Sequence, residues 1–490
     1  MPSVPLSSGS QTTPRQLDVA IASVAVAAPA LRLPLAEVNA AWGRKGGRGQ
    51  VAVCRSDEDT LTLAATAGLR ALEAAGAGPD DVGGLWWGTA RAPFAEGPSW
   101  ATLAATLRLG GTVDGALSTG SSHAGVDALL AAADAIAAGR VDSALVVTSD
   151  ALRPALGSGH ETAAGAGAAA VVLRRGSGPA RLDSVTSRWE PLLDRYRGDE
   201  ESETREAYDG RLFREEVYLP LGAAVTEALG ANAGSRWSIA DPDGRLGSAL
   251  ARRIRTDTVA SADSRAALGD LGAAASLVGI AAALGEVGPA AVFAYGGGRA
   301  TALSIQVDAP VPGAELVAGH LAGGLGTTYA ATLRARRQLS PTGESVEMAV
   351  PPGSAMFVRD QREVLGLIGA RCVECGTVNV PPSVHPSCPG CAGDKFDLVT
   401  LARSGTVQTY VVNHTMPAPF EAPLPLVVVD LDDGTRVQLQ GADDGSALEI
   451  GGRVELVPRR YTIERGVPVY GWKVLSTTPT TVGSGEGSAQ

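Results

Sequence analysis

Hydrophobic and polar positions follow two alternating patterns between residues 17 and 335. Short apolar runs, such as residues 17–29, predict buried strands, and longer blocks with apolar positions at helical spacing, such as residues 57–76, predict amphipathic helices. The block at 57–76 opens with acidic residues, which stabilise the positive N-terminal end of a helix. The same order of strands and helices returns in residues 219–307. The pattern therefore predicts a duplicated α/β domain with largely parallel sheets that helices cover on both faces.

The pattern changes at two further places along the chain. Residues 188–218 are rich in charge and aromatics, so they form either an excursion over a site or a solvated surface loop. After residue 337, a linker rich in Pro, Gly and Ser leads into strand-like runs separated by turn signals, which predict a small all-β unit. The predicted parts are a disordered N-terminus (1–16), two α/β halves (17–175 and 176–337), a linker with a helix and a cysteine cluster (338–400), a β unit (401–476) and a disordered tail (477–490).

Composition narrows the class of protein. With 45% hydrophobic and 19% charged residues, the chain can build a packed core. The net charge of −11 argues against a general nucleic-acid binder or a protein of anionic membrane surfaces, because both need a basic face. No apolar run reaches the ~20 residues of a membrane span, and the N-terminus lacks the pattern of a signal peptide. Four of the five cysteines form one cluster, which suits a metal site in the reducing cytoplasm better than a disulfide framework.

The cysteine cluster carries the most specific motif of the chain. Cys372 and Cys375 form one C-x-x-C pair, Cys388 and Cys391 form another, and twelve residues separate the pairs. Each pair can fold into a knuckle that presents two thiolates, and two knuckles complete a tetrahedral Zn²⁺ site. Four thiolates leave no open position for a substrate, so we expect this zinc to be structural.

Five motifs of the α/β domain, taken in order, resemble the thiolase superfamily and within it the 3-hydroxy-3-methylglutaryl-CoA synthase and ketoacyl synthase III branch. They are STGSSHAGVDALLAA (118–132), GAGAAAVVL (165–173), ADPDGRLGSALA (240–251), GDLGAAASLVGIAAAL (269–284) and AYGGGRA (294–300). Residues 345–475 resemble the rubredoxin-like zinc ribbon and OB-fold proteins that accompany acyl-CoA-handling thiolase relatives. The resemblance implies a five-layered duplicated thiolase-like fold followed by a zinc ribbon and an OB-fold β-barrel.

The resemblance also implies a nucleophilic cysteine at the start of a helix, a glutamate, a histidine and an asparagine. In this chain the four positions hold Ser122, Ala90, Ala240 and Asp270. All four have changed, which makes the ordinary Claisen-type reaction of the family doubtful. Serine has a far higher pKa than cysteine and needs a base to act as a nucleophile.

Several other residues are candidates for altered chemistry. His123, Asp241 and Asp270 are candidate bases for Ser122, although His123 is adjacent to it in sequence and such residues rarely face one another. For His123 and for His160 a surface or interface position is the more frequent interpretation. Tyr295 borders the pocket in the family, and a packing role is equally frequent. Candidate contacts for coenzyme A are Arg195 and Arg197 (with Arg211 and Arg214 as further cations) and the turn glycines Gly297 and Gly298.

Two functions follow from these observations. In the first, the chain is a thiolase-like enzyme with an altered active site, which performs acyl transfer or C–C bond chemistry on an acyl thioester of coenzyme A or a carrier protein in specialised metabolism. In the second, it is a non-catalytic acyl-thioester-binding or scaffolding homologue that partners an active relative. A cytoplasmic homodimer without nucleic-acid or membrane partners is expected in both cases.

Overall fold

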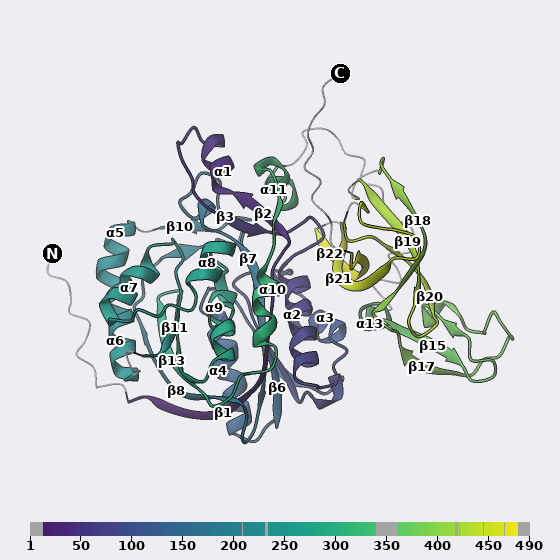
Figure 1. Cartoon of the computed structure of the whole chain (residues 1–490), viewed down its shortest axis with the longest axis horizontal. Helices are drawn as coiled ribbons and strands as arrows, with labels where there is room; N and C mark the ends of the chain where they lie inside the picture. The colour runs from purple at the N-terminus through teal and green to yellow at the C-terminus, as the bar shows by residue number, and fades with distance from the viewer. Residues whose placement is uncertain are drawn as a thin grey trace. The chain divides into compact units, whose positions relative to one another are not determined.

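The computed structural model describes residues 13–207, 209–230, 234–339, 361–416, 420, 422–443, 445–464 and 466–478. The chain divides into two compact units, residues 1–340 and 341–490 (Figure 1). Most of the expected disordered N-terminus, the linker and the end of the expected tail lie outside the described residues. Arg15 and Gln16, which the sequence assigns to the disordered N-terminus, are the first residues of a strand.

The first half of the α/β unit builds one sheet, ordered β1-β7-β6-β4-β5. Its elements are β1 (Arg15–Ala27), α2 (Thr60–Ala74), β4 (Gly84–Gly88), α3 (Ser99–Thr106), β5 (Asp114–Ser118), α4 (Ala124–Ala137), β6 (Ser143–Ala151) and β7 (Ala166–Arg174). Helix α2 begins at a capping box, in which the Asp59 carboxylate accepts from the backbone N–H groups of Leu61 and Thr62. This cap is formed by the last of the acidic residues that open the 57–76 block in the sequence.

The second half repeats this order, as the sequence pattern predicts, but it has one strand fewer. Its elements are β8 (Ala180–Trp189), α6 (Leu219–Leu229), β11 (Arg236–Ile239), α7 (Leu246–Ile254), α9 (Ala275–Ala281), β12 (Gly288–Gly296) and β13 (Arg299–Val307). The strands lie in the order β8-β13-β12-β11, and the pairing of β1 with β8 joins the two halves. Connecting elements are β2 (Leu31–Pro34), α1 (Leu35–Ala41), β3 (Gln50–Val53), β9 (Arg195–Tyr196), β10 (Arg205–Glu206), α5 (Gly210–Leu212), α8 (Ala262–Leu268), α10 (Val317–Leu321), β14 (Leu325–Gly326) and α11 (Tyr329–Ala335).

The expectation of largely parallel sheets is wrong. Strand β4 pairs in parallel with β5 and β6, and β11 with β12, but the β6–β7, β1–β7, β12–β13 and β8–β13 pairs are antiparallel. The cause is that β7 follows β6, and β13 follows β12, without an intervening crossover helix. The β12–β13 turn is the pair Gly297–Gly298, both with positive φ (57° and 72°), which suits a two-residue hairpin.

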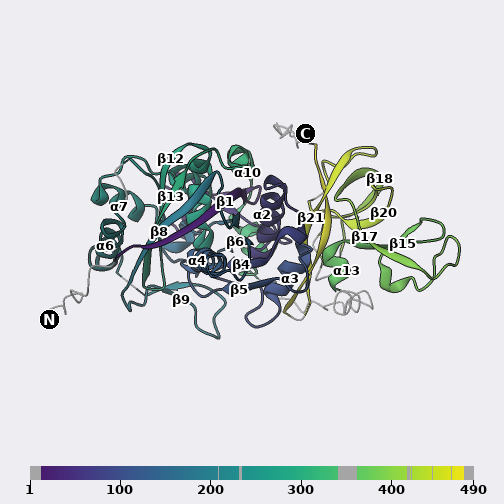
Figure 2. The ribbon, with the colours of Figure 1, turned by 90° about the horizontal axis from the view of Figure 1, so that it is seen from below.

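Helices and sheets alternate in five layers, so the predicted fold class is confirmed. Helices α2 and α3 lie on one side of the unit and α6 and α7 on the other, while α4 and α9 lie between the two halves of the sheet (Figures 1 and 2). The middle layer is packed closely, because a Cβ on Gly125 of α4 would lie 2.0 Å from the Ala273 carbonyl oxygen. A small residue thus lets the segments of the middle layer approach closely.

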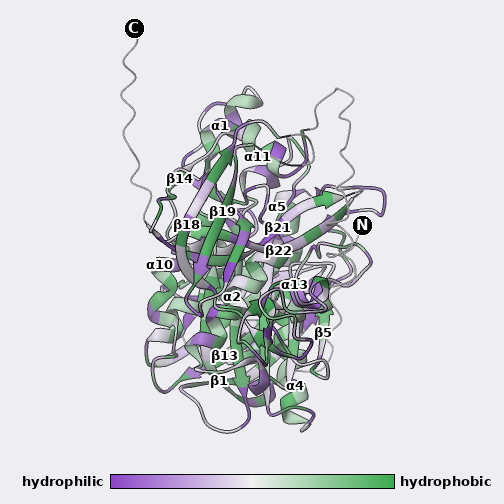
Figure 3. Cartoon of the chain, turned by 90° about the vertical axis from the view of Figure 1, so that its right-hand side faces the viewer, coloured by the Kyte–Doolittle hydropathy of each residue, from purple (hydrophilic) through white to green (hydrophobic). Residues whose placement is uncertain are grey.

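The second unit is a zinc-ribbon fold followed by a five-stranded barrel. Its elements are α13 (Gln361–Gly366), β15 (Ile368–Cys372), β16 (Val378–Asn379), β17 (Phe396–Thr400), β18 (Ser404–Asn413), β19 (Leu424–Leu431), β20 (Arg436–Gln440), β21 (Arg453–Glu464) and β22 (Val467–Ser476). The barrel strands lie in the order β20-β19-β18-β21-β22, and a bridge between Gly441 and Val474 nearly closes them. Buried and half-buried positions alternate along β19, and Figure 3 shows the corresponding mixture of hydrophobic and hydrophilic residues on these strands. The Trp472 indole fixes α13 to the barrel by donating to the Leu365 carbonyl (2.8 Å).

Among the helices that the structure describes, none combines the length and the apolar character needed to cross a bilayer.

Candidate active-site cavity

A cavity of about 160 Å³ lies in the thiolase-like unit, where loops from both halves meet. Ala90, Ser122, Ala240 and Asp270 all line it. These are the four positions at which the resemblance places the catalytic residues of the family. The fold therefore gathers segments that are up to 180 residues apart in sequence, and it gathers them at one cavity.

Ser122 lies in the turn that leads into α4, with its side chain half-buried at the cavity wall. The turn is held by the His123 N–H, which donates to the Ser121 hydroxyl (3.2 Å). Gly296 allows the end of β12 to approach this turn, since a Cβ there would lie 2.6 Å from the His123 nitrogen. Among the described residues, no hydrogen bond joins the Ser122 hydroxyl to a histidine or a carboxylate. The structure therefore gives this serine no preformed base.

His123 does not line the cavity. Its Nε2 lies 2.7 Å from the Thr301 hydroxyl, and its Nδ1 lies 3.1 Å from an Asp127 carboxylate oxygen. The imidazole is buried between α4 and β13. It therefore stabilises the start of α4 from inside the unit. The surface position favoured by the sequence is wrong for this histidine.

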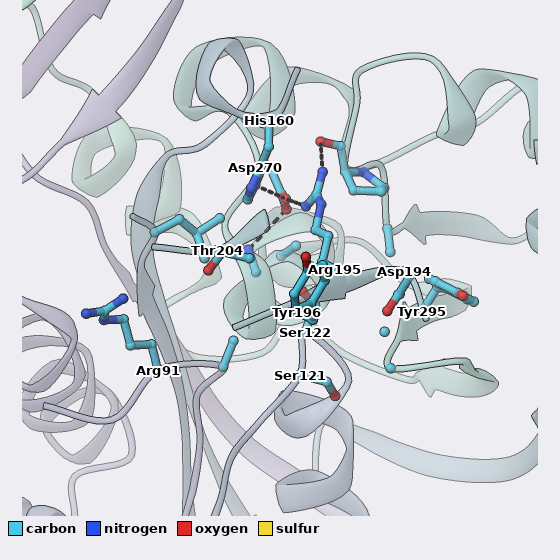
Figure 4. A pocket seen from close by; sticks show the side chains of 18 of the residues that line it. Arg91, Ser121, Ser122, His160, Asp194, Arg195, Tyr196, Thr204, Asp270 and Tyr295 are labelled. Carbon is cyan, nitrogen blue, oxygen red and sulfur yellow. Dashed lines mark hydrogen bonds and ion pairs between the residues drawn. The ribbon is translucent and has the colours of Figure 1, made fainter. Parts of the chain in front are cut away.

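His160 is also buried, and it does line the cavity, so the surface position is wrong for it too. Its Nε2 lies 3.3 Å from Asp270 Oδ2, and Arg195 Nη1 donates to the same oxygen (2.6 Å; Figure 4). Arg195 also donates to the Pro242 carbonyl (3.0 Å). Together His160, Asp270 and Arg195 form a buried polar cluster, which we call the Asp270 cluster.

Charges within the Asp270 cluster favour one protonation state. Burial opposes the charge on Asp270, but the His160 hydrogen bond and the Arg195 charge outweigh it and hold its pKa well below the ordinary value. Burial and the Arg195 charge lower the pKa of His160. The cluster is therefore an Asp270–Arg195 ion pair with a neutral His160. Arg195, which the sequence suggests for coenzyme A phosphates, is engaged within the cluster.

Asp241, Tyr295 and Phe213 line another part of the cavity. Burial raises the pKa of Asp241, and the nearby Asp243 carboxylate adds to this effect. Its Oδ1 is buried and has no hydrogen-bond partner among the described residues. The Tyr295 ring contacts Phe213 edge-on, with centroids 5.4 Å apart. The cavity thus holds a carboxyl group that can exchange a proton nearer neutrality than an ordinary aspartate.

The remaining coenzyme A candidates are divided by the structure. Arg197 and Gly297 line the cavity, whereas Gly298 does not and instead packs its backbone against the Glu190 carbonyl. Arg214 pairs with its neighbour Glu215 on the exposed surface. Arg211 is likewise exposed and does not line the cavity.

Sequence reasoning missed Asp150, Arg91 and Arg153. The Asp150 carboxylate is fully buried and accepts the backbone N–H groups of Ala90, Arg91 and Ala273, and burial raises its pKa to about 7. Arg91 and Arg153 line the cavity directly after β4 and β6. The sequence did contain a signal for the two arginines. Ligands of α/β sheets bind beyond the carboxyl ends of parallel strands, and Arg91 and Arg153 follow the ends of two such strands.

The cysteine cluster of the second unit has the geometry of a metal site. The four thiol sulfurs of Cys372, Cys375, Cys388 and Cys391 lie within 4.8 Å of one another. Each knuckle is closed by a backbone hydrogen bond, from Gly376 N–H to the Cys372 carbonyl (2.9 Å) and from Ala392 N–H to the Cys388 carbonyl (2.7 Å). Four convergent thiolates fit a structural tetrahedral Zn²⁺ ion, with no position left for a substrate.

Known proteins match the two units separately. Residues 359–397 match the family described as the rubredoxin-like zinc ribbon domain of ChsH2, and residues 398–459 match the C-terminal OB-fold domain of ChsH2. A DUF35 domain-containing scaffold protein of Methanocaldococcus jannaschii is 37% identical over 127 residues, which are 24% of this chain and 89% of that protein.

The thiolase-like unit has its own relatives. The hydroxymethylglutaryl-CoA synthase of Methanosphaera stadtmanae is 27% identical over 205 residues, which are 40% of this chain and 59% of that synthase. The chain thus spans less than two thirds of this synthase. The solved structure of MvaS in complex with 3-hydroxy-3-methylglutaryl coenzyme A superposes with a TM-score of 0.57 at 20% identity, over 68% of this chain and 95% of that one. The chain therefore belongs to the family of DUF35 domain-containing proteins through its zinc ribbon and OB-fold, and it joins that unit to a domain with the thiolase-like fold of hydroxymethylglutaryl-CoA synthases.

Proposed function

We propose that the thiolase-like unit binds an acyl thioester of coenzyme A or a carrier protein and acts on its acyl group by acyl transfer or C–C bond chemistry. One observation carries this proposal: Ala90, Ser122, Ala240 and Asp270 line a single cavity, although they come from four separate segments. One shared cavity is what a retained reaction site requires, and it supports the proposal although the four side chains differ from those the resemblance implies. Similarity in fold to MvaS, whose solved structure holds 3-hydroxy-3-methylglutaryl coenzyme A, supports the same ligand class.

The altered site offers two groups for this chemistry. Asp241 has a raised pKa and an oxygen with no partner among the described residues, so it is suited to give or take a proton. Ser122 stands at the start of α4, where backbone N–H groups favour developing negative charge. In acyl transfer to Ser122, a new O–acyl bond forms, the C–S bond breaks, and the hydroxyl proton passes to the sulfur of the leaving thiol.

A non-catalytic role is the second candidate, and a specific observation favours it. The Ser122 hydroxyl has no hydrogen bond to a histidine or carboxylate among the described residues, and serine without a base is a poor nucleophile. Similarity of the second unit to a scaffold protein agrees with this role. Here the cavity would hold an acyl thioester for an active partner.

Intact-protein mass spectrometry separates the two functions. The full chain is incubated with a panel of acyl-CoAs, beside Ser122→Ala and a matched control, Ser248→Ala, whose residue is exposed on α7. We expect an acyl adduct on the wild type and on the control, and none on Ser122→Ala. Turnover that persists in Ser122→Ala would instead assign the chemistry to Asp241.

Thermal-shift titration with coenzyme A completes the design. Stabilisation without any adduct or turnover would establish the binding role. No stabilisation of the wild type at saturating coenzyme A or acyl-CoA would contradict both functions, because ligand binding to the native state must raise its stability.

A further inference from the structure

Three further guanidinium groups border the cavity besides the one in the Asp270 cluster. Arg91, Arg153 and Arg197 come from three separate segments, after β4, after β6 and after β9. Burial lowers the pKa of Arg91 to about 10, and the positive charges of Arg153 and Arg197 contribute to this shift. Arg91 is therefore close enough to Arg153 and to Arg197 for their charges to repel its own. We call these three residues the arginine wall.

Backbone carbonyls, rather than carboxylates, are the hydrogen-bond partners of the arginine wall. Arg91 donates to the Ser202 carbonyl, Arg153 to Arg337 (2.7 Å) and Arg197 to Glu201 (3.1 Å). Over the described part of the chain, no carboxylate oxygen lies within 4.0 Å of these three guanidiniums. The Arg153 Nε is buried and has no hydrogen-bond partner there.

Two acidic groups act on the arginine wall, but they do not balance its three positive charges. Asp150 and Glu203 both act electrostatically on Arg91. Asp150 is occupied by backbone N–H groups, and burial raises its pKa to about 7, so part of its charge is lost at neutral pH. Glu203 accepts a hydrogen bond from the Gln338 side chain (2.9 Å). Positive charge therefore exceeds negative charge at this wall, in a chain whose net charge is −11.

The opposite side of the cavity has a different character. Phe213 and Tyr295 contribute an aromatic surface. In Figure 4, Arg91 lies on one side of the Asp270 cluster and Tyr295 on the other. A volume of about 160 Å³ is close to that of cavities that hold a benzene-sized molecule. The space suits a short acyl chain, with an apolar region at one side and excess positive charge at the other.

We propose that the acyl group carries a free carboxylate at its far end, which Arg91 binds with help from Arg153 and Arg197. The substrate class is then a short dicarboxylic acyl thioester. Arginine is suited to this role, since its planar fork donates two parallel hydrogen bonds to a carboxylate. The proposal rests on the acyl-thioester function above and specifies its substrate.

A phosphate of coenzyme A offers similar oxyanion chemistry. The cavity favours the carboxylate, because it has room for a short chain and not for the nucleotide. The two sources differ in a measurable way: a carboxylate contact acts only on ligands that carry the carboxylate, whereas a phosphate contact acts on every coenzyme A derivative.

Isothermal titration of the full chain with succinyl-CoA, butyryl-CoA and coenzyme A tests the proposal, since the two acyl chains have the same number of carbons. We expect the wild type to bind succinyl-CoA about 10-fold or more tightly than butyryl-CoA, the gain of a charge-assisted hydrogen bond. Arg91→Gln should abolish this preference, because its affinity for succinyl-CoA should fall to about its affinity for butyryl-CoA. Arg153→Gln should reduce it, and Arg252→Gln, an exposed arginine on α7, should leave it intact.

Each other outcome has a definite meaning. Equal wild-type affinity for succinyl-CoA and butyryl-CoA overturns the carboxylate proposal but leaves the acyl-thioester function standing. Loss of affinity for all three ligands in Arg91→Gln, with an unchanged melting temperature, assigns the wall to a phosphate and also overturns it. If the wild type binds none of the three ligands, the acyl-thioester function itself fails, and the carboxylate proposal fails with it.

Discussion

Asp270 shows which neighbours a buried carboxylate requires. An asparagine at this family position would be neutral, whereas the aspartate needs positive or hydrogen-bonding neighbours in order to be buried. Arg195 and His160 supply them, at 2.6 Å and 3.3 Å from the same oxygen. We infer that His160 and Arg195 are the neighbours that allow a charged aspartate to be buried at position 270.

The first prediction concerns the stability that Asp270 confers. Arg195 lies 2.6 Å from Asp270 and 3.6 Å from Glu206. Replacing Asp270 with Asn removes the nearer of these two carboxylates, so we expect a loss of about 3 kcal/mol in the free energy of unfolding, the lower end for breaking a buried ion pair. Asp263→Asn, at an exposed position on α8, is the matched control and should cost little. Denaturant unfolding monitored by circular dichroism measures both.

The same variant has a predicted pH dependence. The pKa of Asp270 in the folded state lies below its unfolded value of about 4, so its stabilising contribution is complete above pH ~4 and is lost as the pH falls toward the folded pKa. Below pH ~4 the wild type should lose stability more steeply than Asp270→Asn. Parallel curves for the two proteins would show that the carboxylate is not held by the ion pair.

At the scale of elements, turns and loops hold the candidate residues of the cavity, while strands and helices supply a frame. Ser122 lies in the turn before α4, Asp241 after β11, and Arg91 after β4. The zinc ribbon follows the same arrangement: β15 and β17 form the frame, and the turns of the two C-x-x-C pairs present the thiolates. The short strands of the ribbon bury little apolar surface, so a bound metal ion has to supply part of their stability.

Metal content tests this element. We expect about one zinc ion per chain by elemental analysis, and far less in Cys388→Ser, which removes a buried ligand. Because metal binding and folding are coupled in such ribbons, backbone amides of residues 368–400 should lose their protection from hydrogen exchange in this variant. Cys54→Ser, at the one cysteine outside the cluster, is the control and should retain the zinc. A wild type without zinc would contradict the assignment.

At the scale of the whole molecule, the large sheet ends at β5, whose residues are exposed or half-buried. An edge strand with unpaired backbone groups is a natural place for a second strand to add. The homodimer that the resemblance implies would cover this edge with the same strand of a second copy.

Light scattering tests this arrangement. We expect the wild type to have twice the chain mass of 49.6 kDa, and Ala116→Asp to shift toward the monomer, since a two-fold axis near β5 would bring two new carboxylates together. Ala262→Asp, at an exposed position on α8, should remain dimeric. A wild type of 49.6 kDa would refute the dimer, and a dimer that tolerates Ala116→Asp would place its interface elsewhere.

Periodicity and spacing alone determined the duplicated α/β domain, the four-cysteine site and the β-rich unit, because these features depend on residues that are close in sequence. The prediction of largely parallel strands was wrong, because a hydrophobic run does not indicate in which direction its strand pairs with its neighbours. The cavity depended on tertiary structure. His160, Arg195 and Asp270 lie in short connecting segments up to 110 residues apart, and the sequences of such segments carry no period that predicts where they lie in the fold. Only the packing of the two halves brings these charges together, and with them the arginine wall.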